Sequence, residues 1–207
     1  MPRATNVALS LIALAAAAAA SNAAVVSVTG QALIVPAPPT AVFGSFTGGV
    51  VHVWDEQQSI NVGGLPVDLS INPSSSTLPT AGAVSGLIDS HFLHYNDWVV
   101  PVSGTVTFNN PIIGVAYNDV FLNISDPVGA FGTLYPTGDT WRGINTIANP
   151  GASIVSISGN TLTFHFEVVP GAPDFDQVRV FTRVVPTPGS LALLGVGGLM
   201  TARRRRA

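Results

Sequence analysis

The middle of the chain consists of short apolar runs separated by clusters of Gly, Pro, Asn and Ser. Residues 153–169 show the clearest period: beyond a break at Gly159-Asn160, the apolar residues Leu162, Phe164 and Phe166 occupy every second position. Strict alternation is typical of a strand with one buried face, and two such runs joined by a Gly-containing pair predict a hairpin.

Similar runs recur along the middle of the chain, and no window there shows a convincing helical period. The predicted strand segments are 24–35, 42–54, 60–71, 84–100, 104–117, 120–124, 153–169 and 175–185. Many short strands with frequent turn residues predict an all-β domain over residues 24–183, built as an antiparallel β-sandwich of jelly-roll or Ig-like type. A closed barrel is the alternative.

The first 23 residues have the layout of a secretory signal peptide. Arg3 supplies a positive start, residues 7–20 are apolar, and Ser21-Asn22-Ala23 forms a small-residue exit. This pattern predicts export and cleavage by signal peptidase after Ala23.

The last segment, residues 184–207, has three parts: a Pro-x-Pro break, an uncharged run and a block of four arginines. Residues 189–202 are fourteen in number, so a helix there is about 21 Å long, against a hydrocarbon core of about 30 Å. We therefore expect a short transmembrane helix that serves as a transient anchor. The stop-transfer residues that hold its end in the cytoplasm are Arg203, Arg204, Arg205 and Arg206.

Charge and cysteine content exclude several classes of function. Between the two ends, three arginines face eleven acidic residues, so the net charge of this region is −8 although the whole chain scores −3. An acidic domain repels nucleic acid, so no nucleic-acid partner is expected. The sequence contains no cysteine and no lysine, which excludes disulfides, thiolate metal sites and a phosphate-binding loop with its lysine.

The tail resembles the PEP-CTERM sorting signal of exported bacterial proteins, in its Pro-Thr-Pro variant. The resemblance rests on the order and spacing of Pro186, Thr187, Pro188 and Gly189, the apolar run and the arginine block; Thr187 stands where the named motif has Glu. It implies cleavage by an exosortase-like membrane protease and delivery to the cell surface or outside, commonly in exopolysaccharide-producing bacteria.

His91 and His94, flanked by Asp89 and Asp97, form the densest polar group in the chain. On a helix the two histidines would share a face and chelate zinc, but on a strand residues three apart point to opposite sides. The predicted strand therefore favours structural or surface roles. Ser90, beside His91, points away from it for the same reason.

No other constellation predicts catalysis. Asp174 and Asp176 lie on one side of an extended segment and are weak calcium candidates. Glu167 is expected to point outward from its strand, with no second carboxylate paired with it by spacing for glycoside hydrolysis. No catalytic residue and no cofactor is assigned.

The aromatic residues leave a binding function open. In one interpretation these residues fill a sandwich core, and in the other they stack against carbohydrate. They are Trp54, Trp98, Trp141, Tyr95, Tyr117 and Tyr135. The leading interpretation is a non-enzymatic component of the cell envelope or extracellular matrix. A module that binds extracellular polysaccharide is the alternative, and a glycoside hydrolase is a weaker one.

Overall fold

The computed structural model describes residues 20–21, 24–70, 80–97, 100–146, 152–167 and 175–186. Residues 22–185 form one compact unit; residues 1–21 and 186–207 form a second. The leader before Ala20 and the tail beyond Pro186, with Thr187, Pro188, Gly189 and the arginine block, lie outside the described residues. No helix in the described part of the chain is long and apolar enough to cross a membrane.

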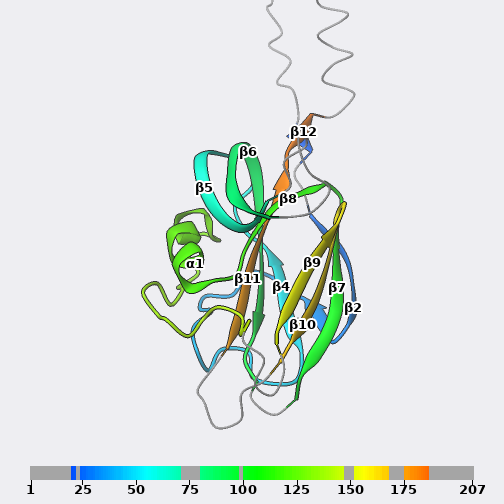
Figure 1. Cartoon of the computed structure of the whole chain (residues 1–207), viewed down its shortest axis with the longest axis vertical. Coiled ribbons are helices and arrows are strands. Elements are labelled where there is room, and N and C mark those ends of the chain that lie inside the picture. The colour runs from blue at the N-terminus through cyan, green and yellow to red at the C-terminus, as the bar shows by residue number, and fades with distance from the viewer. Residues whose placement is uncertain are drawn as a thin grey trace, which may run out of the picture. The chain divides into compact units, whose positions relative to one another are not determined.

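The protein is mostly β-structure, which confirms the all-β prediction (Figure 1). The strands are β1 (Ala20–Ser21), β2 (Val25–Gly30), β3 (Ala32–Ile34), β4 (Val51–Asp55), β5 (Ile60–Ser70), β6 (Thr80–Tyr95), β7 (Val102–Phe108), β8 (Ile112–Ala116), β9 (Ile154–Ser158), β10 (Thr161–Phe166), β11 (Asp176–Arg183) and β12 (Val185–Pro186). The four-stranded sheet has the order β2-β7-β10-β9, and the six-stranded sheet the order β11-β8-β5-β6-β4-β3; β1 pairs with β12.

The two large sheets share one hydrophobic core. The four-stranded sheet contributes Val106, Leu162 and Phe164, and the six-stranded sheet contributes Leu93 and Val180. Val106 in β7 and Leu162 and Phe164 in β10 alternate with residues that face the solvent, as the sequence period predicts. The hairpin of β9 and β10 turns at Gly159-Asn160, where Gly159 has a φ of 63°, the left-handed conformation that favours glycine there.

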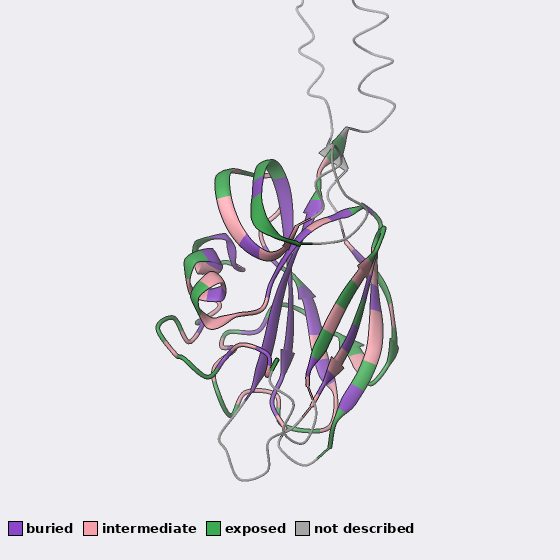
Figure 2. Cartoon of the chain, in the orientation of Figure 1, coloured by how far each residue is buried: buried purple, intermediate pink, exposed green. Residues whose placement is uncertain are grey.

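The six-stranded sheet closes partly on itself. Strand β6 pairs with β5 along its first half and with both β4 and β11 along its second half. Strand β8 pairs with β11 on one side and with β5 on the other, which completes a ring of four strands. The centre of this sheet is buried on both faces: every residue from Ile88 to Tyr95 is buried, as Figure 2 shows in purple.

The second face of the six-stranded sheet has its own core beneath a short helix. Helix α1 (Asp119–Ser125) and the 3-10 helix η1 (Asp126–Val128) follow β8 directly. This helix corrects the prediction of a strand over residues 120–124. Its apolar sequence suits a strand, but the side chain of Asn118 accepts the N–H of Phe121 at 2.9 Å as an N-cap, and Leu122 is buried.

Three other expectations differ from the structure. Strands β3 and β4 pair in parallel, so the sheets are not wholly antiparallel. Residues 42–50, predicted as part of a strand, form turns and bends, with an isolated bridge at Thr47. Residues 104–117 form parts of two strands, since Asn109, Asn110 and Pro111 interrupt the run.

Close packing at Gly104 yields a stability prediction. A Cβ atom at Gly104 would lie 2.2 Å from the backbone oxygen of Thr29 and 2.7 Å from Cζ of Phe164, whereas one at Gly63 would meet nothing within 4 Å. Gly104→Ala should therefore lower the free energy of unfolding by about 2 kcal/mol or more, from overpacking. Gly63→Ala should change it by less than about 1 kcal/mol. Urea unfolding of both variants measures the difference, and equal effects would contradict the packing described here.

Candidate functional site

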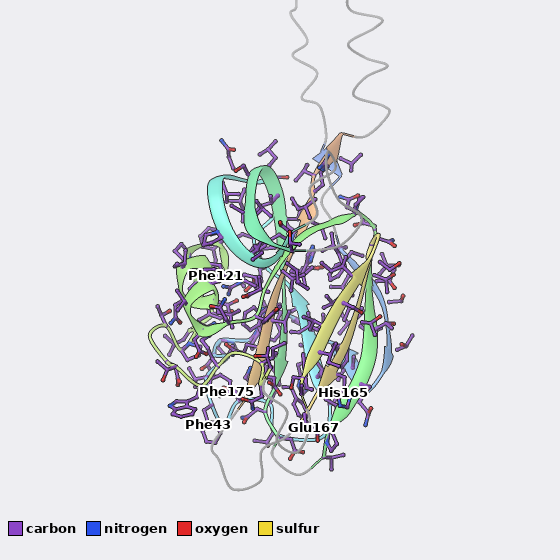
Figure 3. All side chains as sticks on the ribbon, viewed as in Figure 1. Phe43, Phe121, His165, Glu167 and Phe175 are labelled. Atoms are coloured by element: carbon purple, nitrogen blue, oxygen red, sulfur yellow. The ribbon has the colours of Figure 1, made fainter. Side chains whose placement is uncertain are left out.

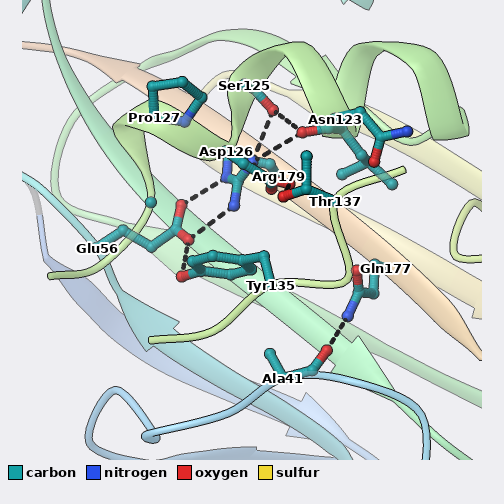
Figure 4. A network of polar contacts seen from close by, with 12 residues as sticks. Ala41, Glu56, Asn123, Ser125, Asp126, Pro127, Tyr135, Thr137, Gln177 and Arg179 are labelled. Atoms are coloured by element: carbon teal, nitrogen blue, oxygen red, sulfur yellow. Dashed lines mark hydrogen bonds and ion pairs between the residues drawn. The ribbon is translucent and has the colours of Figure 1, made fainter. Parts of the chain in front are cut away.

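A buried ion pair between Arg179 and Glu56 joins strand β11 to the segment after β4 (Figure 4). Both side chains are fully buried. Arg179 donates from Nε to one oxygen of Glu56 at 2.8 Å and from Nη2 to the other at 3.1 Å. Ser90 and Tyr135 also donate their hydroxyls to the two Glu56 oxygens. This two-pronged geometry is the strong form of an arginine–carboxylate contact.

The remaining guanidinium nitrogen of Arg179 contacts the α1–η1 segment. This segment covers the second face of the six-stranded sheet and is called the covering layer below. Nη1 donates to the Leu122 carbonyl at 3.2 Å, to Ser125 Oγ at 2.7 Å and to Asp126 Oδ1 at 3.1 Å. The guanidinium carbon also lies 4.7 Å from the ring centre of Phe92 and 4.8 Å from that of Tyr135. A buried cation held between two aromatic faces gains cation–π stabilisation in addition to its hydrogen bonds.

A second buried arginine, Arg142, continues the network. It donates from Nη1 and Nη2 to the two carboxylate oxygens of Asp126, at 2.7 and 3.1 Å, and from Nε to Gln177 at 2.8 Å. Gln177 then donates to Nδ1 of His94 at 2.9 Å, and the opposite ring nitrogen of His94 lies 2.9 Å from the Ser45 carbonyl. These contacts fit a neutral imidazole that donates from Nε2.

The network is neutral in total, with two guanidinium groups and two carboxylates. Burial alone would raise the pKa of Asp126, but the hydrogen bonds from Arg142 and the charge of Arg179 lower it overall. Burial alone would lower the pKa of Arg179, and the Glu56 carboxylate raises it overall. Burial also lowers the pKa of His94 to about 4, so this imidazole is neutral near pH 7.

We interpret this network as a structural element. It links β4, β6 and β11 to the α1–η1 segment and to the loops around Ala41 and Tyr135, and its arginine and glutamate side chains have no exposed surface. Groups placed in this way hold the covering layer on the sheet, and they offer no contact to a ligand.

His91 and His94 face opposite sides of β6, as the strand interpretation predicts. His91 contacts Asp55 Oδ1 at 2.7 Å and Thr182 Oγ1 at 3.0 Å, next to Phe108. The order carboxylate, imidazole, hydroxyl is that of a hydrolase triad, but both His91 and Thr182 are fully buried. Asp89 is buried too and accepts the Ser59 N–H at 2.6 Å.

The structure describes one of the two calcium candidates. Asp174 lies outside the described residues, and Asp176 is buried at the start of β11, opposite Tyr95. Within the described ranges, no group of three or more His, Asp or Glu side chains is placed to hold a metal ion.

The aromatic residues divide between core and surface. Trp54, Tyr95 and Tyr135 are buried, while Trp141 is 67% exposed. Tyr117 is partly buried against the shared core, and Trp98 lies outside the described residues. Of the predicted stacking platforms, Trp141 is the one that the structure places at the surface.

A shallow hollow of about 390 Å³ lies on the outer face of the four-stranded sheet, and it is the candidate functional site. At its end Ser103 Oγ lies 2.7 Å from Nδ1 of His165, and Nε2 of His165 lies 3.1 Å from Glu167 Oε2. His165 and Glu167 stand together at the end of β10 in Figure 3. Glu167 thus points outward, as predicted, but its partner is a histidine. The residues that line the hollow are Ser103, Gly104, Thr105, Ile154, Ser156, Thr163, Phe164 and His165.

The hydroxyl, imidazole and carboxylate of this group are better suited to binding than to acyl transfer. Ser103 bonds Nδ1 rather than Nε2, and its own backbone N–H donates to Gln31 Oε1 at 3.0 Å, which leaves that N–H unable to stabilise an oxyanion. What the group offers a ligand is the exposed Ser103 and the partly exposed imidazole of His165.

The sequence interpretation missed this surface, although a signal for it was present. Ser or Thr occupies alternate positions in β7, β9 and β10: Ser103, Thr105 and Thr107; Ser156 and Ser158; Thr161 and Thr163. The same period that places the apolar residues in the core places these hydroxyls outside.

A second hollow, of about 320 Å³, lies beside the turn that follows residue 42. Its described lining is Phe43, Gly44, Thr47, Gly48, Asn96 and Asp97. Phe43 also packs against Phe175, with ring centres 6.0 Å apart. This hollow offers mainly apolar and backbone surface.

Comparison with known proteins adds no assignment. No protein-family model matches the chain, and no curated protein or solved structure matches it either.

The buried ion pair yields a stability prediction with a matched control. Glu56→Gln removes the carboxylate charge opposite Arg179 and should lower the free energy of unfolding by roughly 3–5 kcal/mol, because the buried Arg179 loses the carboxylate that binds it with both oxygens and keeps only Asp126. Arg183, an exposed arginine on the same strand, is the control: Arg183→Gln should change the value by less than about 0.5 kcal/mol. Chemical denaturation of both variants at pH 7 makes the comparison. A similar small effect for the two would show that the pair is dispensable.

His94 predicts a pH dependence of stability. Its folded pKa of about 4 lies below the ordinary 6.5, so the unfolded chain takes up a proton first as the pH falls. Stability should therefore decrease from about pH 7.5 downward and stop decreasing, for this group, below about pH 4, a total of about 3 kcal/mol.

His94→Gln should flatten this decrease, with a smaller slope remaining because burial also lowers the pKa of His52. Urea midpoints from pH 8 to pH 4.5 give the measurement. A slope identical in the wild type and His94→Gln would contradict the neutral, buried imidazole.

Proposed function

We propose that the protein is an exported component of the bacterial cell envelope or extracellular matrix without catalytic activity. Signal peptidase removes residues 1–23, and the Pro-Thr-Pro tail holds the precursor in the membrane until an exosortase-like protease cleaves it. The supporting features are the signal-peptide pattern before Ala24, the short apolar run and the block of four arginines.

One structural observation carries the non-catalytic part of this proposal. Several charged and titratable groups of the domain are used inside the fold: Glu56 pairs with Arg179, Asp126 pairs with Arg142 and Arg179, and His91 and His94 are buried with partners. Groups that are desolvated and fully hydrogen-bonded stabilise a fold and are not presented to a substrate. This arrangement supports a binding or scaffolding role.

For the domain itself we infer a β-sandwich of jelly-roll or Ig-like kind, supported by two sheets that contribute to one core. The outer face of the four-stranded sheet is open to solvent, which suits a protein that works by surface contact.

A second candidate function is carbohydrate binding, and the hollow on the four-stranded sheet favours it. The hollow combines exposed hydroxyls with the imidazole of His165, which are groups that hydrogen-bond sugars. Glycoside hydrolysis has less support, since the two glutamates of the chain are placed differently: Glu56 is buried beneath α1, and Glu167 contacts His165.

The sorting proposal predicts the termini of the mature protein. Expressed in a bacterium with an exosortase, the released protein should begin at Ala24 and should lack Arg203, Arg204, Arg205 and Arg206. Cell fractionation with mass spectrometry of the terminal peptides measures both ends.

The matched variant replaces the four arginines with serine, which removes the positive stop and should let the tail pass through the membrane. Secreted protein that still contains the arginine block would refute processing. Anchoring that is unchanged in the serine variant would refute the stop function.

A further inference from the structure

The outer face of the four-stranded sheet is a regular lattice of hydroxyl groups. The strand registers align Thr29, Thr105, Thr163 and Ser156 in one row across all four strands. They align a second row two residues away: Ser27, Thr107, Thr161 and Ser158. In a β-sheet, neighbouring members of one row lie about 4.8 Å apart, which is the distance between strands. Two rows lie roughly 6.7 Å apart, measured along the strands.

The lattice carries no charge. None of the strands β2, β7, β9 and β10 contains Asp, Glu, Lys or Arg. Edge strands, here β2 and β9, often carry charged side chains that discourage association with other strands. Threonine alone is common on strand faces, where cross-strand pairs stabilise the sheet, but four strands without a single charged side chain are not explained by strand propensity.

The hydroxyls are only partly satisfied by one another. Thr29 and Thr105 lie 2.7 Å apart between their Oγ1 atoms, and Thr107 and Thr161 lie 3.3 Å apart. A hydroxyl has one donor and two acceptor positions, so each pair keeps one donor and three acceptors for a ligand. The lattice therefore suits a partner that also presents both donors and acceptors at repeated positions.

We propose that this hydroxyl lattice is the docking surface for a neutral, extended polysaccharide, with the hollow beside Ser103 and His165 as its end. The proposal rests on the carbohydrate-binding candidate above and names its surface and ligand class. Sugar hydroxyls are both donors and acceptors and repeat along a chain, so they match the lattice. The net charge of −8 on the region between leader and tail disfavours anionic polymers.

The binding test uses purified protein in gel-retardation assays with a neutral β-glucan and with anionic alginate. The wild type should bind the glucan and not alginate. Thr105→Val together with Thr163→Val removes two central hydroxyls while keeping β-branched side chains, and should weaken glucan binding roughly tenfold or more. Thr105→Ser with Thr163→Ser keeps the hydroxyls and should bind like the wild type.

A matched variant separates this surface from an aromatic platform. Trp141→Ala removes an exposed aromatic ring in the loop before Ile144 and should leave glucan binding unchanged. If Trp141→Ala abolishes binding and the valine pair does not, carbohydrate binding stands and the lattice proposal is wrong. Export and processing are read from the terminal peptides, so their failure is seen independently.

Further outcomes overturn the proposal. They are absence of glucan binding by the wild type, binding to alginate alone, and equal binding by the folded valine pair. The thermal unfolding midpoint checks that the valine pair folds. If it does not, Ser156→Ala with Ser158→Ala removes hydroxyls of the same rows on the edge strand β9 and should also weaken binding.

Discussion

The fold depends on a cation held inside it. Arg179 lies on a strand that is paired on both sides, and its guanidinium group is bound by Glu56, by Asp126 and by carbonyl and hydroxyl groups of helix α1. Desolvating one arginine is costly, and the pair of carboxylates with two aromatic rings offsets that cost only if every element is in position. We infer that a charged centre of this kind favours one arrangement of the covering layer over others that apolar packing alone would accept.

This constraint accounts for the polar residues that lie beside the apolar core on the second face of the six-stranded sheet. The residues of β6 that point to this face include Ser90 and His94 as well as Phe92. Each of these polar groups bonds a member of the network, so the layer of loops and helix is held by directional contacts. The first face, between the sheets, is by contrast mainly apolar, with the Asp55–His91–Thr182 contact near its edge.

The hydrophobic period of the sequence predicted the strands and the faces on which their side chains lie. The prediction failed where contacts with residues far away in the sequence determine the local structure. Alternation located the β9–β10 hairpin and placed His91 and His94 on opposite faces. Residues 120–124 have strand-like composition, and the helix there depends on the Asn118 cap and on burial of Leu122 by other elements. The ion pair of Glu56 and Arg179 joins residues 123 positions apart, a separation for which one sequence offers no signal.

The ring of four strands has a mechanical consequence for any chain end that follows Val185. Strand β11 lies between β6 and β8, with eight residue pairs to β6 in one unbroken register. A pull on the chain beyond β11 acts along a strand that is bonded on both edges, so many hydrogen bonds bear the load together. Detaching this strand would also require extracting the Arg179 side chain from its carboxylates. Detachment of β11 therefore breaks pairing on both of its edges together with the ion pairs of Arg179.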